Sequence, residues 1–402
     1  MIMRTLFLFF IICFTGLDLS AEPPLAVYLT WQRDPATTMT VQWISKKDSS
    51  QDSIQYQRVE KDKWKNTEGT HKDMPQNEPY YVHYVELTDL RPDSTYRFHL
   101  PDSDHEYRFR TMPEQLTESL TFLAGGDTNQ CGTEVFEETN RQAAKQEPAF
   151  VLFGGDLAYA SPTERLENED AQRWLDWIAS YSRTMITPSG NLIPLLVTIG
   201  NHDIKGNNLG TPHDAPFFFT LFAMPNYPGY NVLRFGSYLS IFLLDTNHAN
   251  PIKGKQTKWL SHELAKDSAR NTLHRFAIYH VAAYPSVRRY SHGSAPSIRY
   301  YWVPLFEKHH LNVAFENNDH AYKRTYPLLN DVVHPQGIVY IGDGSWGTTP
   351  RVPKPAEASQ FFAKTQSIRQ FMKVKLTPTS REFWSITPSG TVIDHYVQFV
   401  QK

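Results

Sequence analysis

Several short apolar runs of this chain end at a residue that can bind a metal ion or transfer a proton. Asp127 follows LTFLAGG, Asp156 follows PAFVLFGG and His280 follows HRFAIY. The other runs of this kind end at Asn201, His202 and Asp203, at Asp245, and at Asn318 and His320. Such runs are typical of buried strands, and ligands collect beyond the carboxyl ends of strands in open α/β sheets. We therefore expect these side chains to converge on one site.

The predicted chemistry follows from these strand-end residues taken together and not from any one of them. An Asp after a strand is often only the N-cap of the next helix. Together, however, carboxylates, an amide oxygen and imidazoles offer the mixed oxygen and nitrogen ligation that suits iron, manganese or zinc. A central carboxylate can bridge two ions about 3.5 to 4 Å apart, a spacing that clamps the attacking and leaving oxygens of a phosphoryl group. The residues alone therefore predict metal-dependent chemistry on phosphate esters.

The order of these motifs resembles that of the metallophosphoesterase (calcineurin-like phosphoesterase) superfamily. The matching motifs, spread over residues 120–345, are GGDTN at Asp127, GGDLAY at Asp156, GNHD at Asn201, IYH at His280 and NNDH at His320. Tyr159, which comes soon after the second aspartate, is similar to the tyrosine that marks the purple acid phosphatase branch. Five motifs in the family's order are far more specific than any one of them.

This resemblance implies two metal ions and assigns their ligands. It makes Asp127, Tyr159 and His320 ligands of the first metal, and Asp156 a bridge to the second. It makes Asn201 and His280 ligands of that second metal. Free tyrosine has a pKa of about 10, so a bound phenolate calls for a strong Lewis acid. The expected cofactors are Fe(III) and a second divalent metal, which is Fe, Zn or Mn.

The resemblance also implies a reaction. It indicates an exported dinuclear-metal phosphoric ester hydrolase of purple acid phosphatase type, which attacks phosphomonoesters with a metal-bound hydroxide. His202 is expected to touch the phosphate and protonate the leaving oxygen, and Asp203 to hold His202 or raise its pKa. His292, on the loop after His280, is a candidate substrate-binding residue. The expected partner is a small phosphate-ester substrate.

One motif departs from the family pattern. Where the family has Gly-His-x-His, residues 317–320 read Asn-Asn-Asp-His, so Asn318 replaces a histidine ligand of the second metal. An amide oxygen is a harder, neutral donor, and second-site affinity is expected to fall or to shift toward manganese or iron(II). His248, His309 and His310 are other histidines that no sequence argument places in the site. Two alternatives stay open: a phosphodiesterase on the same site, and a non-enzymatic binding or surface protein with an impaired second site.

The elements that must position these residues form two domains in sequence. Residues 22–112 alternate like β-strands, and Leu90, Pro92 and Tyr96 resemble a tyrosine corner, which predicts an all-β fibronectin type III-like sandwich. Residues 113–120 are a polar linker. Residues 121–402 alternate strands with helices, and the resemblance implies an α/β four-layer metallophosphoesterase sandwich, two mixed β-sheets flanked by helices. Its helices are expected at 134–146, 169–183, 256–265 and 297–309, with a late hairpin at 371–400 completing the second sheet.

Composition limits the partners and the compartment. The 402 residues hold 40 basic and 42 acidic side chains, and no basic patch argues for nucleic acid as a partner. Residues 1–21 carry Arg4, an apolar core and a small residue at Ala21, which predicts a signal peptide and a secreted or periplasmic protein. That apolar run is too short for stable membrane insertion. Cys131 is expected to be a buried small residue, and the oligomeric state is not indicated.

Overall fold

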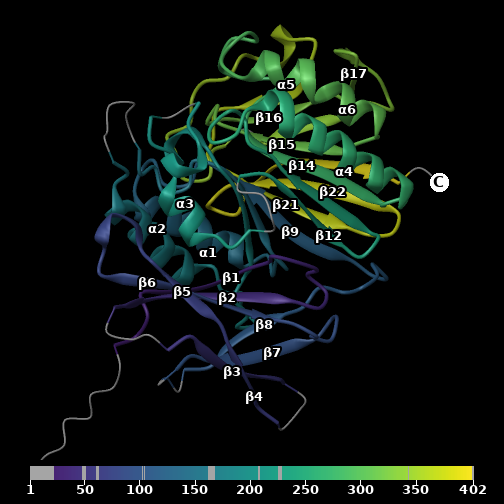
Figure 1. Ribbon diagram of the computed structural model, residues 1–402. Coiled ribbons are helices and arrows are strands. Elements are labelled where there is room, and N and C mark those ends of the chain that lie inside the picture. Colours follow the sequence, from purple (N-terminus) through teal and green to yellow (C-terminus); the bar gives the residue numbers. More distant parts are fainter. Residues whose placement is uncertain are drawn as a thin grey trace, which may run out of the picture.

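The computed structural model describes residues 22–47, 51–59, 63–101, 103, 105–161, 168–206, 209–224, 229–342 and 344–400. The signal peptide expected at residues 1–21 lies outside the described residues. Figure 1 shows a smaller all-β part below a larger body in which helices lie on either side of β-sheet. Among the described residues, no helix has the length and apolar character needed to cross a bilayer.

The N-terminal part is a sandwich of two four-stranded antiparallel sheets. The first sheet runs in the order β1 (Ala26–Thr30), β2 (Met39–Lys46), β6 (Tyr80–Leu87) and β5 (Thr70–Asp73). The second runs in the order β4 (Lys65–Glu68), β3 (Ser53–Arg58), β7 (Thr95–His99) and β8 (Tyr107–Arg110). The Tyr96 hydroxyl accepts a hydrogen bond from the Arg91 backbone N–H at 2.8 Å, the contact expected of a tyrosine corner.

Two mixed sheets form the centre of the larger body. The six-stranded sheet has the order β11 (Leu195–Thr198), β10 (Val151–Gly154), β9 (Leu120–Gly125), β21 (Phe371–Leu376), β22 (Ser380–Ile386) and β23 (Val392–Phe399). The seven-stranded sheet has the order β12 (Asn231–Phe235), β13 (Leu239–Leu243), β14 (His274–Val281), β15 (Val313–Asn317), β19 (Val339–Gly342), β16 (Tyr322–Thr325) and β20 (Phe362–Gln366). A small ribbon pairs β17 (Leu328–Leu329) with β18 (Val332–Val333).

Helices cover the outer face of each sheet, which confirms the predicted four-layer fold (Figure 1). The helices α1 (Thr133–Ala144) and α2 (Ala171–Thr184) share a buried core with β10 and β11, beside α3 (Pro216–Leu221). The helices α4 (Thr257–Ala269), α5 (Ala295–Tyr301) and α6 (Val303–Lys308) share another with β13, β14 and β15. A third core fills the space between the sheets, where the Phe122 and Phe150 rings stack at 4.9 Å.

Buried hydrogen bonds join the N-terminal sandwich to the larger body. The Leu221 carbonyl, at the end of α3, accepts bonds from the Tyr28 hydroxyl at 2.7 Å and from Gln42 Nε2 at 2.8 Å. Ser182 of α2 bonds both the N–H and the carbonyl of Val27 at 2.8 Å. The sandwich therefore braces the helices that flank the six-stranded sheet.

Three expectations were wrong, two about secondary structure and one about the burial of a side chain. The helix expected at 297–309 is two helices, α5 and α6, which meet at Trp302 just before a proline. The tail extends the six-stranded sheet, because β21 pairs antiparallel with β9, rather than completing the second sheet. Cys131 is exposed, with its Sγ 3.3 Å from the Thr349 hydroxyl. The predicted domain limits, with a first domain at 22–112, a linker at 113–120 and a second domain at 121–402, stay a prediction.

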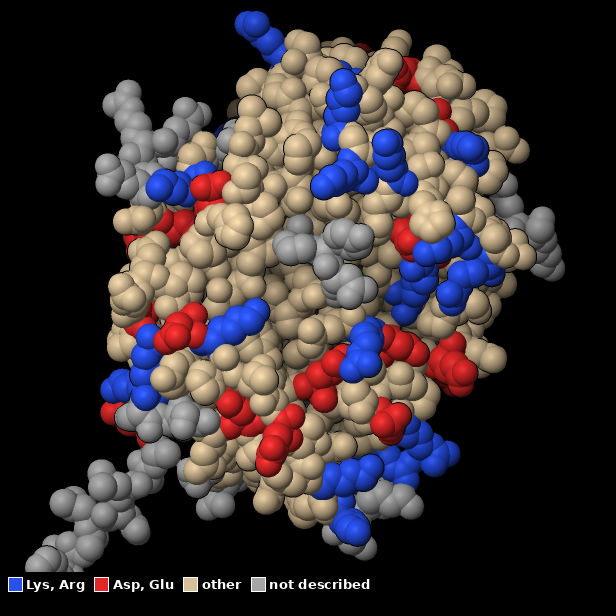
Figure 2. Space-filling model, viewed as in Figure 1, with Lys and Arg blue, Asp and Glu red and all other residues tan. Residues whose placement is uncertain are grey.

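Charge on the visible face is mixed. Figure 2 shows Lys and Arg as well as Asp and Glu on both the upper and the lower parts of this face. Charged side chains on the surface of the protein pair with the opposite charge, such as Arg33 with Glu86 at 2.6 Å. Exposed pairs of this kind contribute little to stability. The expectation of no nucleic-acid partner stays a prediction.

The buried carboxyl of Glu169, just before α2, makes stability depend on pH. It accepts hydrogen bonds from Trp174 Nε1 at 3.1 Å and from the Phe217 N–H at 3.5 Å. Burial raises its pKa from 4.5 to about 8. Since the folded pKa exceeds the unfolded one, the stabilisation is complete below pH 4.5 and is lost as the pH rises through about 8.

We expect Glu169→Gln to flatten part of this pH dependence. Between pH 5 and 9 the free energy of unfolding of the wild type should fall relative to that of the variant, by on the order of a few kcal/mol. Thermal unfolding midpoints measured across this range test it. The control is Glu134→Gln, at an exposed position of α1. Parallel curves for the wild type and Glu169→Gln would contradict the assignment.

Candidate metal centre

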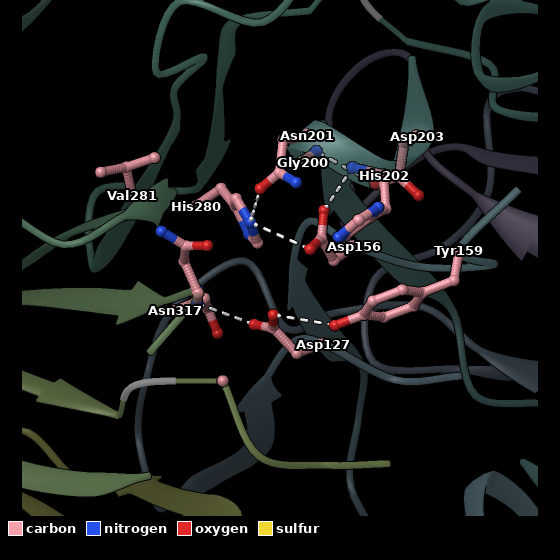
Figure 3. A network of polar contacts seen from close by, with 12 residues as sticks. Asp127, Asp156, Tyr159, Gly200, Asn201, His202, Asp203, His280, Val281 and Asn317 are labelled. Carbon is pink, nitrogen blue, oxygen red and sulfur yellow. Dashed lines mark hydrogen bonds and ion pairs between the residues drawn. The ribbon is translucent and has the colours of Figure 1, made fainter. Parts of the chain in front are cut away.

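The predicted site residues meet at the carboxyl edge of both sheets. Asp127 lies just beyond β9, Asp156 just beyond β10, and Asn201 and His202 just beyond β11. His280 lies near the end of β14, and His320 follows β15. Figure 3 shows the side chains of Asp127, Tyr159, Asp156, His280 and Asn201 turned toward one another. The expected convergence of strand ends is therefore present.

One cluster of donor atoms surrounds Asp127. Its Oδ1 lies 2.9 Å from His320 Nε2 and 3.2 Å from the Tyr159 hydroxyl. The Tyr159 hydroxyl is also 3.1 Å from His320 Nε2. All three side chains are buried, at 0–3% exposure. A carboxylate, a phenol and an imidazole that share one small buried space are a donor set that fits a transition-metal ion.

A second cluster surrounds Asp156 and His280. His280 Nε2 lies 3.3 Å from Asp156 Oδ2 and 3.1 Å from the Asn201 side-chain oxygen. The other ring nitrogen of His280 bonds the Gly154 carbonyl at 2.9 Å. A backbone carbonyl on the far ring nitrogen is the usual means of orienting a metal-binding histidine. This set also fits a metal ion, and Asp156 stands between it and the first cluster, since Asp127, Asp156 and His320 each offer an atom within 4.8 Å of the others.

Buried charge favours a cation at this centre. Burial opposes protonation of His280, but Asp156 and Asp127 outweigh it and raise its pKa to about 9. Burial opposes ionisation of Asp156, yet His280 and His202 hold its pKa well below the ordinary range. Burial raises the pKa of Tyr159 well above 10, with the negative field of Asp127 adding to it. The field that retains these protons is the same field that attracts a metal cation.

The backbone is strained at the centre. Positive φ angles occur at non-glycine residues of the site, namely Asp127 (56°), Asp156 (52°), Tyr159 (55°), Asn318 (76°) and His320 (57°). Each such residue costs of order 1 kcal/mol or more, and strain of this kind gathers at functional sites. The backbone turns sharply at these strand ends, and the side chains of Asp127, Asp156, Tyr159 and His320 meet at the centre.

Asn317 has a structural role that the sequence did not indicate. Its amide donates to the Tyr279 carbonyl at 2.9 Å and fills space left by glycine on the neighbouring sheet. A Cβ added at Gly154 would lie 1.7 Å from Asn317 Nδ2. The amide therefore packs the end of β15 against the end of β10.

Asn318 contacts the site through its backbone. Its N–H donates to Asp127 Oδ2 at 2.8 Å, and its carbonyl accepts from Arg351 at 3.2 Å and from Arg288. A role for its side chain on a second metal stays a prediction. The ring of His248 lies 5.5 Å from that of His280 and is buried, whereas His309 bonds Ser268 on α4. His248 lies beside the centre because of the way the folded chain packs. Its position in the sequence relative to the motifs did not indicate this.

The predicted catalytic residues are held in different ways. His202 Nδ1 bonds the Ser161 carbonyl at 2.7 Å, and its ring stacks on Tyr159 at 4.7 Å. The Asp203 oxygens accept from the backbone N–H groups of Leu157 at 2.8 Å and Gly200 at 3.0 Å, so this carboxylate holds the loop backbone. Burial raises the pKa of Asp203 to about 8.

His292 is exposed on the loop after β14, where its N–H donates to the Arg289 carbonyl at 2.9 Å. Its contact with phosphate stays a prediction. Asp245, another residue at the end of a strand, has a structural role, since it accepts bonds from the backbone N–H groups of His248, Ala249 and Asn250.

Comparison with known proteins bears on both parts of the chain. Residues 24–111 match the family model described as purple acid phosphatase, N-terminal domain, and residues 120–334 match that of calcineurin-like phosphoesterase. Purple acid phosphatase 21 of Arabidopsis thaliana is 25% identical over 311 residues, which cover 76% of this chain and 67% of that protein. The Fe(3+)-Zn(2+) purple acid phosphatase 12 of the same plant is 23% identical, covering 78% and 70%.

Among solved structures, the purple acid phosphatase PPD1 from yellow lupin (Lupinus luteus) seeds superposes with a TM-score of 0.75 at 15% identity, covering 92% of this chain and 73% of that one. The chain spans about two thirds of the length of several curated relatives that it matches. The fold, the site and these matches show that the chain belongs to the calcineurin-like phosphoesterase family, a class of metal-dependent phosphatases. Within that family it falls in the purple acid phosphatase branch.

We expect Gly200→Ala to disrupt the centre without unfolding the protein. The added Cβ would lie 2.2 Å from both the backbone nitrogen and Oδ1 of Asp156, so this carboxylate must move. A displacement of about 1 Å at such a site can cost about a hundredfold in rate. Metal content and phosphatase activity should both fall. At the control position Gly190 an added Cβ meets nothing within 4 Å; its φ of 85° makes Gly190→Ala cost some stability, but metal content and activity per folded chain should be kept. Equal losses in the two variants would contradict the argument.

Proposed function

We propose that this chain is an exported phosphomonoesterase of purple acid phosphatase type that works with two metal ions. The observation that carries the proposal is the pair of adjacent buried donor clusters, one around Asp127 and one around His280, with Asp156 between them. A tyrosine in the first cluster favours Fe(III), and the imidazole and amide of the second favour a divalent ion, which is Fe, Zn or Mn. Two such ions, when bound, supply Lewis acidity to the phosphoryl oxygens.

The chain's own residues position the substrate and the proton. His202 Nδ1 is held by the Ser161 carbonyl, so Nε2 is the ring nitrogen left to protonate the leaving oxygen. Stacking on Tyr159 fixes the plane of the ring. Asp203 keeps the loop that carries His202 in place through its two backbone bonds. His202 is thus the proposed general acid, and Asp203 is a positioning residue.

We expect His202→Ala to lower kcat by about a hundredfold or more on an alkyl phosphate monoester. The loss should be much smaller on p-nitrophenyl phosphate, whose leaving group needs little protonation. The exposed His213 provides the control His213→Ala, which should leave both rates unchanged. Equal losses on the two esters would remove His202 from the acid role. Faster cleavage of a diester than of a monoester by the wild type would favour a phosphodiesterase.

A second candidate function rests on Asn318. With an asparagine where the family has a histidine, the second site binds its metal more weakly than the first. A protein that keeps the fold but does not turn over substrate would act as a binding protein or a surface protein. The buried His248 ring beside His280 offers an imidazole near that site. The nearby imidazole favours a second metal site that works with asparagine over a second metal site that has lost its function.

Metal analysis separates these two functions. We expect mass spectrometry to find two metal ions per wild-type chain, one of them iron, in protein purified without chelators. Asn318→His should then change activity by no more than about threefold, because the second ion is already bound. One ion or none in the wild type, with a large gain of metal and activity in Asn318→His, would establish the binding-protein function instead. Asn66→His, at an exposed position of the N-terminal sandwich, is the matched control for adding a histidine outside the centre.

Export is proposed from residues 1–21 alone. Arg4, the apolar run after it and Ala21 form the expected leader. A mature protein whose first residue lies close to position 22 would be the direct support, and recovery of the intact leader would contradict it.

A further inference from the structure

A second group of metal-binding side chains lies in the N-terminal sandwich, apart from the phosphatase centre. Asp52 directly precedes β3, His71 lies on β5, and His83 lies on β6. One ligand atom of each lies within 4.8 Å of the others. These residues take no part in the proposed reaction, so their grouping needs a separate explanation.

The group joins the two sheets of the sandwich. His71 and His83 are directly paired across β5 and β6 in one sheet, and their rings lie 5.6 Å apart. Asp52 leads into β3 of the other sheet, and its carbonyl accepts from the Gly69 N–H at 2.7 Å. Gly69 is where the chain passes from β4 to β5, that is, from one sheet to the other. The cluster therefore lies at the crossing point between the sheets.

The donor atoms face one another closely. Asp52 Oδ2 lies 2.8 Å from His71 Nδ1, and Asp52 Oδ1 lies 2.6 Å from His83 Nδ1. Zinc bound tetrahedrally, with ligand distances of about 2.0 to 2.2 Å, separates its ligand atoms by roughly 3.3 Å. A shift of roughly half an ångström opens the cluster to that geometry. Two imidazoles and a carboxylate are a ligand set that zinc accepts in proteins, with water in the fourth position.

The surroundings of His83 prepare it as a ligand. Its Nε2 lies 2.8 Å from the Ser45 hydroxyl, which can accept the ring proton while donating to the Lys46 carbonyl at 3.2 Å. The ring is fully buried and stacks on Trp43 at 4.5 Å, with an interplanar angle of 1°. Without metal, Nδ1 donates its proton to Asp52 at 2.6 Å; when an ion binds, the ring proton can move to Nε2, where Ser45 accepts it, and Nδ1 is then free to bind the ion. A hydrogen bond on the far nitrogen is the usual support of a zinc-bound histidine.

The cluster is also open to entry by an ion. The side chains of His71 and Asp52 are 29% and 20% exposed, whereas His83 is buried. An ion can enter from the His71 side and keep a water molecule there.

We propose that Asp52, His71 and His83 form a structural zinc site that cross-links the two sheets of the N-terminal sandwich. In this site the ion replaces the direct hydrogen bonds between the carboxylate and the two rings. Binding should stabilise the sandwich, because the unfolded chain does not hold the three ligands together. The site is independent of the proposed phosphatase chemistry.

The test uses the full-length protein equilibrated with zinc and freed of excess ion by gel filtration. We expect His71→Ala and Asp52→Asn each to hold one zinc ion fewer per chain than the wild type, with phosphatase turnover unchanged. The exposed His105 lies in the same sandwich, outside the cluster, and His105→Ala should match the wild type. Zinc should raise the thermal unfolding midpoint of the wild type more than that of His71→Ala.

A measurement on the wild type alone covers the case in which a variant fails to fold. In protein with ¹⁵N-labelled histidine, zinc should shift the Nδ1 resonances of His71 and His83, and not that of His105. Unshifted resonances, or equal zinc content in the wild type and His71→Ala, would show a hydrogen-bonded triad without a metal and overturn the proposal. Equal zinc loss in His105→Ala would overturn it as well.

Discussion

Two buried carboxylates that lie close together dominate this structure. Asp127 and Asp156 are almost fully buried, and like charges in such a place repel strongly unless hydrogen bonds and cations offset them. The protein offers part of the compensation: Asn318 N–H donates to Asp127, and His202 N–H donates to Asp156. His280, which keeps its proton under their field, offers more. The left-handed backbone at both aspartates aims them inward despite its cost. The strand ends and the backbone N–H groups of the loops that follow them together hold this charge in one place.

The sequence predicted the strands and the identity of the converging side chains because both depend on local patterns. Apolar runs that stop at a carboxylate or an imidazole define a strand and its edge without reference to the rest of the chain. What the sequence could not predict depends on contacts between distant segments. Asn317 reads as a simple departure from a motif, but its amide fills the space beside Gly154. Periodicity predicts that a segment forms a strand, but it does not predict which strand that segment pairs with, as in the pairing of β21 with β9. The break between α5 and α6, in contrast, has a local cause that the helix prediction passed over, because Pro304 lacks the N–H that would continue the helix.

The N-terminal sandwich is part of the same packed structure as the phosphatase centre. The core between the two large sheets continues into the interior of the sandwich, so Val41 and Phe98 belong to the same buried cluster as Phe122 and Phe276. Hydrogen bonds from Tyr28 and Gln42 to the Leu221 carbonyl add polar anchors at this junction. The sandwich therefore packs directly against α2 and α3, which flank the sheet that carries Asp127 and Asp156.

The position of β21 in the chain has a consequence for the order of assembly. On one side β9, whose end carries Asp127, pairs with β10, and on the other it pairs with residues 372–376. During synthesis the ribosome makes β9 long before residues 372–376, so β9 remains an open edge strand until those residues have emerged. Asp127, at the tip of β9, is thus carried by a strand that gains its second neighbour only after β10 and β11 have been made, so the cluster around Asp127 rests on the part of the sheet that closes late.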